Sequence, residues 1–141
     1  IDSKIISSQQ SSNDIIPVTE KIAISLTFKV NQPKDDVFVK LKLFSSSHVH
    51  VFDALDTKKS VFNKVGILQR TVWINRNMLN EDTYYVGLSL ISPPFKNPQI
   101  HLEIDNIISF ETAFFKNKNS VKGDFEDKWG GAIAPELLWT D

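Results

Sequence analysis

The segment Glu20–Val30, EKIAISLTFKV, alternates strictly between apolar and polar or small residues, and this alternation decides the fold class. Its apolar face consists of Ile22, Ile24, Leu26, Phe28 and Val30. Successive side chains of a strand point to opposite faces, so a period of two residues predicts a strand with one buried face. One buried face and one wet face are typical of an antiparallel sheet.

Other short segments of the same kind follow along the chain, separated by turn residues. We expect strands at residues 1–7, 37–44, 49–55, 66–75, 83–92, 100–104 and 107–115. No segment has the period of an amphipathic helix. The sequence therefore predicts an all-β, immunoglobulin-like antiparallel β-sandwich, with a closed barrel as the architectural alternative.

Length and charge limit the possible classes of protein. The 141 residues fit one domain, residues 1–141. The net charge of −1, from 16 basic and 17 acidic residues, argues against nucleic acid as a partner. No apolar run approaches the ~20 residues that span a bilayer. The chain begins with Ile1 rather than Met, so we expect a fragment or a processed chain.

The closing stretch, residues 123–141, reads GDFEDKWGGAIAPELLWTD and is unusually apolar for a chain end. We expect Ala132–Trp139 to form a strand. Because Pro135 cannot donate a ladder hydrogen bond, that strand should lie at a sheet edge or carry a bulge. Gly130 and Gly131 could act as a hinge that sends the strand to its own sheet or to another copy of the chain. The residues expected to make this exchange or dimer contact are Gly130, Gly131, Pro135, Leu137 and Trp139.

Motifs for catalysis are missing from the sequence. No glycine-rich phosphate loop and no G-x-S-x-G motif occurs, and the chain has no cysteine. His48 and His50 lie two apart on an expected strand near Asp53, so a metal site is conceivable. His101 is the only other histidine, and we expect surface or ligand-contacting histidines with no metal and no cofactor. The acidic residues of 124–127 are expected to be a solvated loop.

The outward residues of 83–92 and 37–44 suggest a binding surface. Tyr85 is followed on its face by two small residues, Gly87 and Ser89, which predicts a shallow trough. If 37–44 is the neighbouring strand, its outward Phe38, Lys40, Lys42 and Phe44 add aromatic walls and donors. A sugar ring suits such a site, because its C–H face packs on an aromatic ring and its hydroxyls need polar partners. The alternative is that a loop or a second subunit covers these aromatic residues.

Several segments together resemble the C-terminal domains of Wzt-type ATPase subunits, which belong to ABC transporters that export O-antigen and related bacterial polysaccharides. The closing stretch is the most specific part, with Gly131, Pro135 and Trp139 at the family's Gly, Pro and Trp. Residues 48–57 (HVHVFDALDT), 78–90 (MLNEDTYYVGLSL) and 107–110 (IISF) match shorter motifs. Asp82 is a departure, since the family usually has Gly before the strand that begins with Tyr.

The resemblance implies an immunoglobulin-like domain that recognises the exported glycan, often at its modified non-reducing end. It also implies a cytoplasmic location behind an ATPase domain at the inner membrane, and a dimer in which the C-terminal strand can be exchanged. We therefore expect a non-catalytic carbohydrate-binding domain whose partners are the polysaccharide, a second copy and a membrane transporter subunit. The carbohydrate-binding candidates are Tyr85, Ser89, Lys40, Lys42 and Phe44, with His48, His50, Gln69, Arg70 and Trp73 as weaker candidates. A dimerisation domain without a ligand, and an enzyme such as a glycosidase or metal-dependent hydrolase, are the competing hypotheses.

Overall fold

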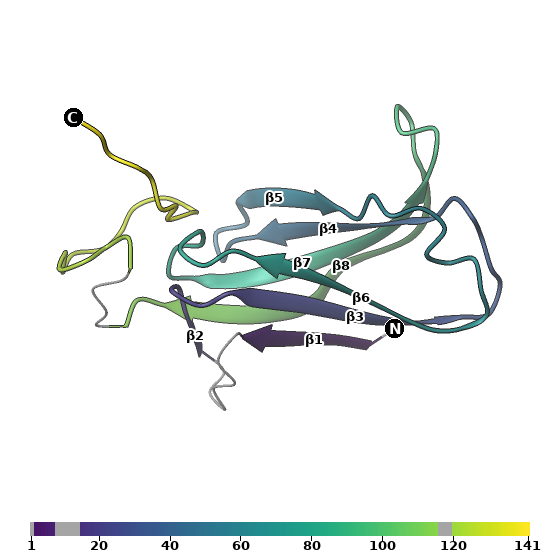
Figure 1. Cartoon of the computed structure of the whole chain (residues 1–141), viewed down its shortest axis with the longest axis horizontal. Helices are drawn as coiled ribbons and strands as arrows, with labels where there is room; N and C mark the ends of the chain where they lie inside the picture. Colours follow the sequence, from purple (N-terminus) through teal and green to yellow (C-terminus); the bar gives the residue numbers. More distant parts are fainter. Residues whose placement is uncertain (1, 8–14, 116–119) are drawn as a thin grey trace.

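The structure, a computed structural model, describes residues 2–7, 15–115 and 120–141, and these ranges form two facing β-sheets (Figure 1). No helix occurs in the described ranges. The strands are β1 (Asp2–Ser7), β2 (Ile15–Pro17), β3 (Ile22–Val30), β4 (Phe38–Phe44), β5 (His50–Leu55), β6 (Gly66–Ile74), β7 (Thr83–Ser92) and β8 (Gln99–Ala113).

The first sheet has the order β1-β3-β6 and the second has the order β2-β8-β7-β4-β5. Two separate sheets confirm the predicted sandwich and exclude the alternative of a closed barrel. The pairings are antiparallel except that of β2 with β8, which is parallel. The sequence did not predict β2, because a three-residue strand is too short to display a period.

The core lies between the sheets and follows the predicted alternation. Ile24 and Leu26 of β3 are each 2% exposed, and Tyr84 and Val86 of β7 are fully buried. Phe28 packs edge-on against Phe62 at 5.2 Å. Burying one face of each strand in this way supplies the main stabilising term of the fold.

Two predicted boundaries need correction. β5 begins at His50, so His48 and His50 do not share a strand. The two strands expected at 100–104 and 107–115 are a single long strand, β8. The expected first strand is present as β1, and Ile1 lies outside the described residues.

The strand expected at Ala132–Trp139 is not formed within this chain, and its pairing with a second copy stays a prediction. Ile133 forms an isolated bridge with Leu79, the Ala134 N–H donates to the Met78 carbonyl at 2.7 Å, and the Glu136 N–H donates to the Asn77 carbonyl at 2.9 Å. Regular pairing does not extend beyond these contacts, and Pro135 has no N–H to offer. Beyond them the tail runs away from the sandwich (Figure 1), with Leu138 90% exposed and Trp139 91% exposed.

The Gly130–Gly131 pair, predicted as a hinge, is held in place by Asn80, which precedes β7, and by Tyr84, which lies within β7. The Asn80 amide donates to the Trp129 carbonyl at 2.9 Å and to the Gly131 carbonyl at 2.5 Å. The Tyr84 hydroxyl lies 2.9 Å from the carbonyls of both Asn80 and Ala132. Burial, together with the nearby charge of Asp82, raises the pKa of Tyr84, so its hydroxyl remains a donor. In this structure the part of the tail without such contacts starts after Glu136.

Candidate functional site

The outer face of the five-stranded sheet carries most of the residues predicted to bind a ligand. In the register of β4 with β7, Phe44 lies opposite Tyr85, Lys42 opposite Gly87, and Lys40 opposite Ser89. Because residues opposite one another in an antiparallel pair share a face, the predicted trough and its aromatic walls are on one surface. Phe38 is covered on this face by Phe95, whose ring lies edge-on at 5.3 Å.

A bulge in β8 deepens this surface beside Gly87. Val86 pairs with Ile108 and Leu88 with Ile104, so β8 contains two more residues than β7 across this interval. A Cβ atom at position 87 would lie 3.2 Å from the Asp105 carbonyl oxygen, closer than ordinary van der Waals contact. Glycine therefore lets the bulged backbone approach β7.

Together, the trough and the bulge form a hollow of about 550 Å³ that is open to solvent. This volume is within the usual range of small-ligand sites. The hollow is lined by Lys42, Phe44, His48, Tyr85, Gly87, Leu88, Ser89, Glu103, Ile104, Asp105 and Asn106. It thus combines two aromatic side chains with ammonium, imidazole, hydroxyl, amide and carboxylate groups.

Lys40 and His50 lie beside the hollow rather than in its lining. Asp53 joins them: its carboxylate is 2.6 Å from His50 Nε2 and 3.4 Å from Lys40 Nζ. The His50 ring stacks on Phe44 at 5.0 Å, which fixes the aromatic wall. Burial raises the pKa of Asp53, but the His50 hydrogen bond and the Lys40 charge outweigh it, and the pKa is lowered. By contrast, the side-chain ammonium of Lys42 makes no hydrogen bond or ion pair with any residue of the described ranges.

His48 reaches the hollow from the turn that joins β4 to β5. Its backbone is in the left-handed region, with φ of 61°, and its N–H donates to the Ser45 carbonyl at 3.0 Å. The Ser46 hydroxyl ties the turn to Asp82, with 2.5 Å between Ser46 Oγ and Asp82 Oδ1. A positive φ is uncommon for histidine, and this tight turn accounts for it.

Three weaker candidates, Gln69, Arg70 and Trp73, lie on β6 in the other sheet, so they do not belong to this hollow. The Gln69 amide donates to Ser25 Oγ at 2.8 Å. Trp73 is 53% exposed on the outer face of the smaller sheet. Alternation indicates which way the side chains of a strand point, but it carries no information about which sheet the strand joins.

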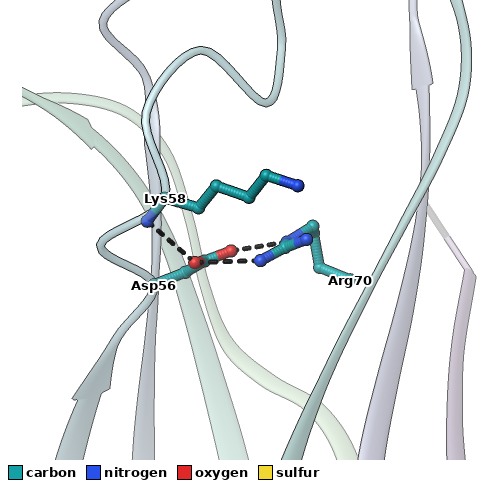
Figure 2. Close-up of polar contacts among 3 residues, drawn as sticks. All are labelled: Asp56, Lys58 and Arg70. Atoms are coloured by element: carbon teal, nitrogen blue, oxygen red, sulfur yellow. Dashed lines mark hydrogen bonds and ion pairs between the residues drawn. The ribbon is translucent and has the colours of Figure 1, made fainter.

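Arg70 faces inward and binds Asp56 at the gap between the sheets (Figure 2). Its Nε and Nη2 donate to the two carboxylate oxygens at 2.6 and 3.1 Å, and the Lys58 N–H donates to the same carboxylate at 3.1 Å. Burial raises the pKa of Asp56, but the Arg70 and Lys58 hydrogen bonds outweigh it, and the pKa is lowered. This pairing explains why an arginine occupies an apolar face of β6.

The same side of the sandwich is open between the edge strands β5 and β6. Two cavities of about 250 and 290 Å³ lie there, and Ile24, Leu41, Ala54 and Val72 line both of them. Arg70 and Asp56 line the smaller one. Aliphatic side chains make up most of the lining, although Phe52 and Trp73 also line the larger cavity. In the smaller one, the charged groups of Arg70 and Asp56 are already paired with each other.

The sequence interpretation missed the contribution of β8 to the hollow. Glu103, Asp105 and Asn106 form its far wall. A signal was present, because the two consecutive polar residues Asp105 and Asn106 break the alternation of apolar and polar residues in 100–104, as expected for a bulge.

The described ranges contain no group of three His, Cys, Asp or Glu side chains close enough to hold a metal ion. His50 and Asp53 form only a pair, and His48 lies in the separate turn. No helix in these ranges is long and apolar enough to cross a membrane.

Comparison with known proteins shows that this chain resembles a solved structure in its fold. No family model matches the sequence, and no curated protein matches it. Among solved structures, the chain is similar to one described as the crystal structure of the C-terminal domain of wzt, with a TM-score of 0.75 and 9% identity. The alignment covers 100% of this chain and 81% of that chain. The chain therefore has the fold of the domain family that its sequence motifs resemble.

Proposed function

We propose that this chain is a non-catalytic carbohydrate-binding domain that recognises a bacterial O-antigen-type polysaccharide for export by an ABC transporter. In this role it would act as a homodimer in the cytoplasm, joined to an ATPase domain at the inner membrane. The likeness of fold to the C-terminal domain of wzt and the matching sequence motifs support the proposal.

The main structural support for glycan binding is the hollow on the outer face of the five-stranded sheet. Tyr85 and Phe44 stand opposite each other in the β4–β7 register and offer rings on which a sugar can pack. Ser89, Asn106 and Lys42 are placed around them to bond hydroxyl groups. The hollow is open rather than enclosed, which suits a segment of a long chain.

The test is a titration of the purified domain with the O-polysaccharide of the organism that carries the gene, followed by NMR or calorimetry. The glycan is used intact and with its terminal residue removed. Saturable binding to the intact glycan alone would mean that the domain reads the chain end. If a folded domain binds neither glycan, the proposal is wrong.

A pair of variants locates the binding face. Tyr85→Ala should weaken binding about tenfold, since an aromatic contact contributes about 1.4 kcal/mol. Trp73→Ala removes an exposed aromatic ring from the other sheet and should leave affinity unchanged. Equal losses in both variants would contradict the assignment of the hollow, and unfolding of Tyr85→Ala would mean that Tyr85 is a core residue.

The apolar tail favours a second candidate function, dimerisation without a ligand. Leu137, Leu138 and Trp139 are 70%, 90% and 91% exposed, and such a patch is usually covered by a partner. The partner we propose is a second copy that exchanges the tail. The two functions are compatible, and the glycan titration separates a domain that has both from one that only dimerises.

A further inference from the structure

A second cavity, of about 500 Å³, lies at the end of the sandwich where β7 begins. It is lined by the β4–β5 turn, the residues before β7 and the closing segment: Ser45, Ser46, Ser47, Val49, Asn80, Glu81, Asp82, Phe114, Lys122, Lys128, Trp129, Gly130, Gly131 and Ala132. None of these residues lines the hollow around Tyr85.

Trp129 is a fixed aromatic wall of this cavity. Its ring meets Phe125 edge-on at 5.6 Å and Phe114 at 6.5 Å, and its carbonyl accepts the Asn80 amide. The side chain nevertheless stays partly exposed. A ring that is immobilised before binding loses little conformational entropy when a ligand packs on it.

The polar groups of the cavity suit hydroxyl groups better than an ion. The Asp82 carboxylate accepts from Ser46 and from the Thr83 N–H, and Glu81 accepts from the Phe114 N–H. Lys122 lies over the Phe114 ring at 5.2 Å. Two lysines and two carboxylates balance in charge, so the cavity favours an uncharged polar ligand.

The two cavities share one wall. Phe44 and His48 line the first, whereas Ser45, Ser46, Ser47 and Val49 of the same turn line the second. Along the chain, Asp82 of the second cavity and Tyr85 of the first are three residues apart, about 10 Å in a strand. A ligand that occupies both must pass over the turn and be longer than a single sugar ring.

We propose that the cavity at Trp129 is a second subsite for an uncharged sugar unit of the same glycan chain that occupies the hollow at Tyr85. This rests on the proposed function. The domain then reads two successive parts of the chain, and the Ser45–Val49 turn, fixed by the Ser46–Asp82 hydrogen bond, sets their spacing.

Indole N–H signals in NMR test this directly, because the chain has three tryptophans and two of them are internal controls. Trp73 lies on the smaller sheet and Trp139 in the exposed tail. The probe is the O-polysaccharide of the organism that carries the gene, as short and long fragments from partial hydrolysis. With long fragments, we expect the Trp129 signal and the backbone signals around Tyr85 to shift over the same concentration range, while Trp73 stays fixed.

Variants give the affinity of each subsite. Trp129→Leu should weaken long fragments about tenfold and leave the shortest bound fragment unchanged, whereas Tyr85→Ala should weaken both. Lys128→Ala, at the exposed rim, provides a milder change if Trp129→Leu fails to fold. Saturation around Tyr85 with an unmoved Trp129 signal would overturn the second subsite and leave the proposed function standing. Absence of all glycan binding would overturn both.

Discussion

Replacing Asn80 by alanine should release the closing segment from the sandwich while the rest of the fold stays intact. Asn80 is 6% exposed, and its amide donates to the carbonyls of Trp129 and Gly131. A hydrogen bond contributes about 1 kcal/mol net, so the two bonds hold the segment by about 2 kcal/mol. That corresponds to roughly a 30-fold change in the equilibrium between the bound and the released segment.

Hydrogen exchange measures this change at two amides. The N–H groups of Ala134 and Glu136 donate to the carbonyls of Met78 and Asn77, and both should exchange roughly 30-fold faster in Asn80→Ala. The amide of Leu26, in the middle of β3, should change much less. Gln69→Ala is the matched control, since it removes an amide that donates to Ser25 on the other sheet.

The reasoning would be refuted if the amides of Leu26, Ala134 and Glu136 all accelerated by the same factor. The closing segment would then open only when the whole domain unfolds. A typical domain is stable by about 5–15 kcal/mol, so the loss of about 2 kcal/mol leaves the variant folded under the assay conditions.

Three further changes are predicted. Gly87→Ala places a Cβ 3.2 Å from the Asp105 carbonyl oxygen, so it should displace the bulge. The free energy of unfolding, measured in urea, should fall by about 1 kcal/mol, and glycan binding should weaken. Unchanged chemical shifts at Asp105 would contradict this. Because the folded-state pKa of Asp56 is lowered, its carboxylate stabilises the fold above its unfolded pKa of about 3.9, and that contribution is lost as pH falls through the folded pKa. Asp56→Asn should therefore be less stable than the parent near neutral pH, with a difference that shrinks below about pH 4; a constant difference across that range would refute the linkage. Removing residues 137–141 deletes the exposed part of the tail and should give a monomer in sedimentation, whereas a persisting dimer would place the interface elsewhere.

Alternation along single strands was sufficient to predict the sandwich and part of the site. β3 has one fully buried face and β7 has one that is buried except at the half-buried Leu90, so their side-chain directions followed from the sequence, as did the outward positions of Tyr85 and Ser89. Gln69 and Trp73 were expected to contribute to the binding surface, yet they lie on β6 in the other sheet. Sheet membership depends on pairing between distant segments, which a local period does not record.

What covers the tail, and the backbone conformation of His48, could not be predicted from local alternation. The apolar character of 132–139 indicates that something covers this segment, but it does not distinguish the same chain from a second copy. His48 was placed on a strand because its neighbours fit one, whereas its left-handed backbone depends on the turn and on the Ser46–Asp82 bond. In both features, some of the contacts come from residues far away in the sequence: Asn80 for the closing segment and Asp82 for the turn.

The bulge beside Gly87 also bears on how binding specificity could change between related proteins. A one-residue insertion in a strand would turn every later side chain to the opposite face, but β8 has two extra residues here, so Ile104 and Ile108 still both face Leu88 and Val86. Insertions or deletions of two residues at 105–107 would therefore reshape the ligand surface and leave the core sequence in phase. A change of length by two residues here would therefore cost the fold little, and under the proposed function it would alter which glycan fits the hollow.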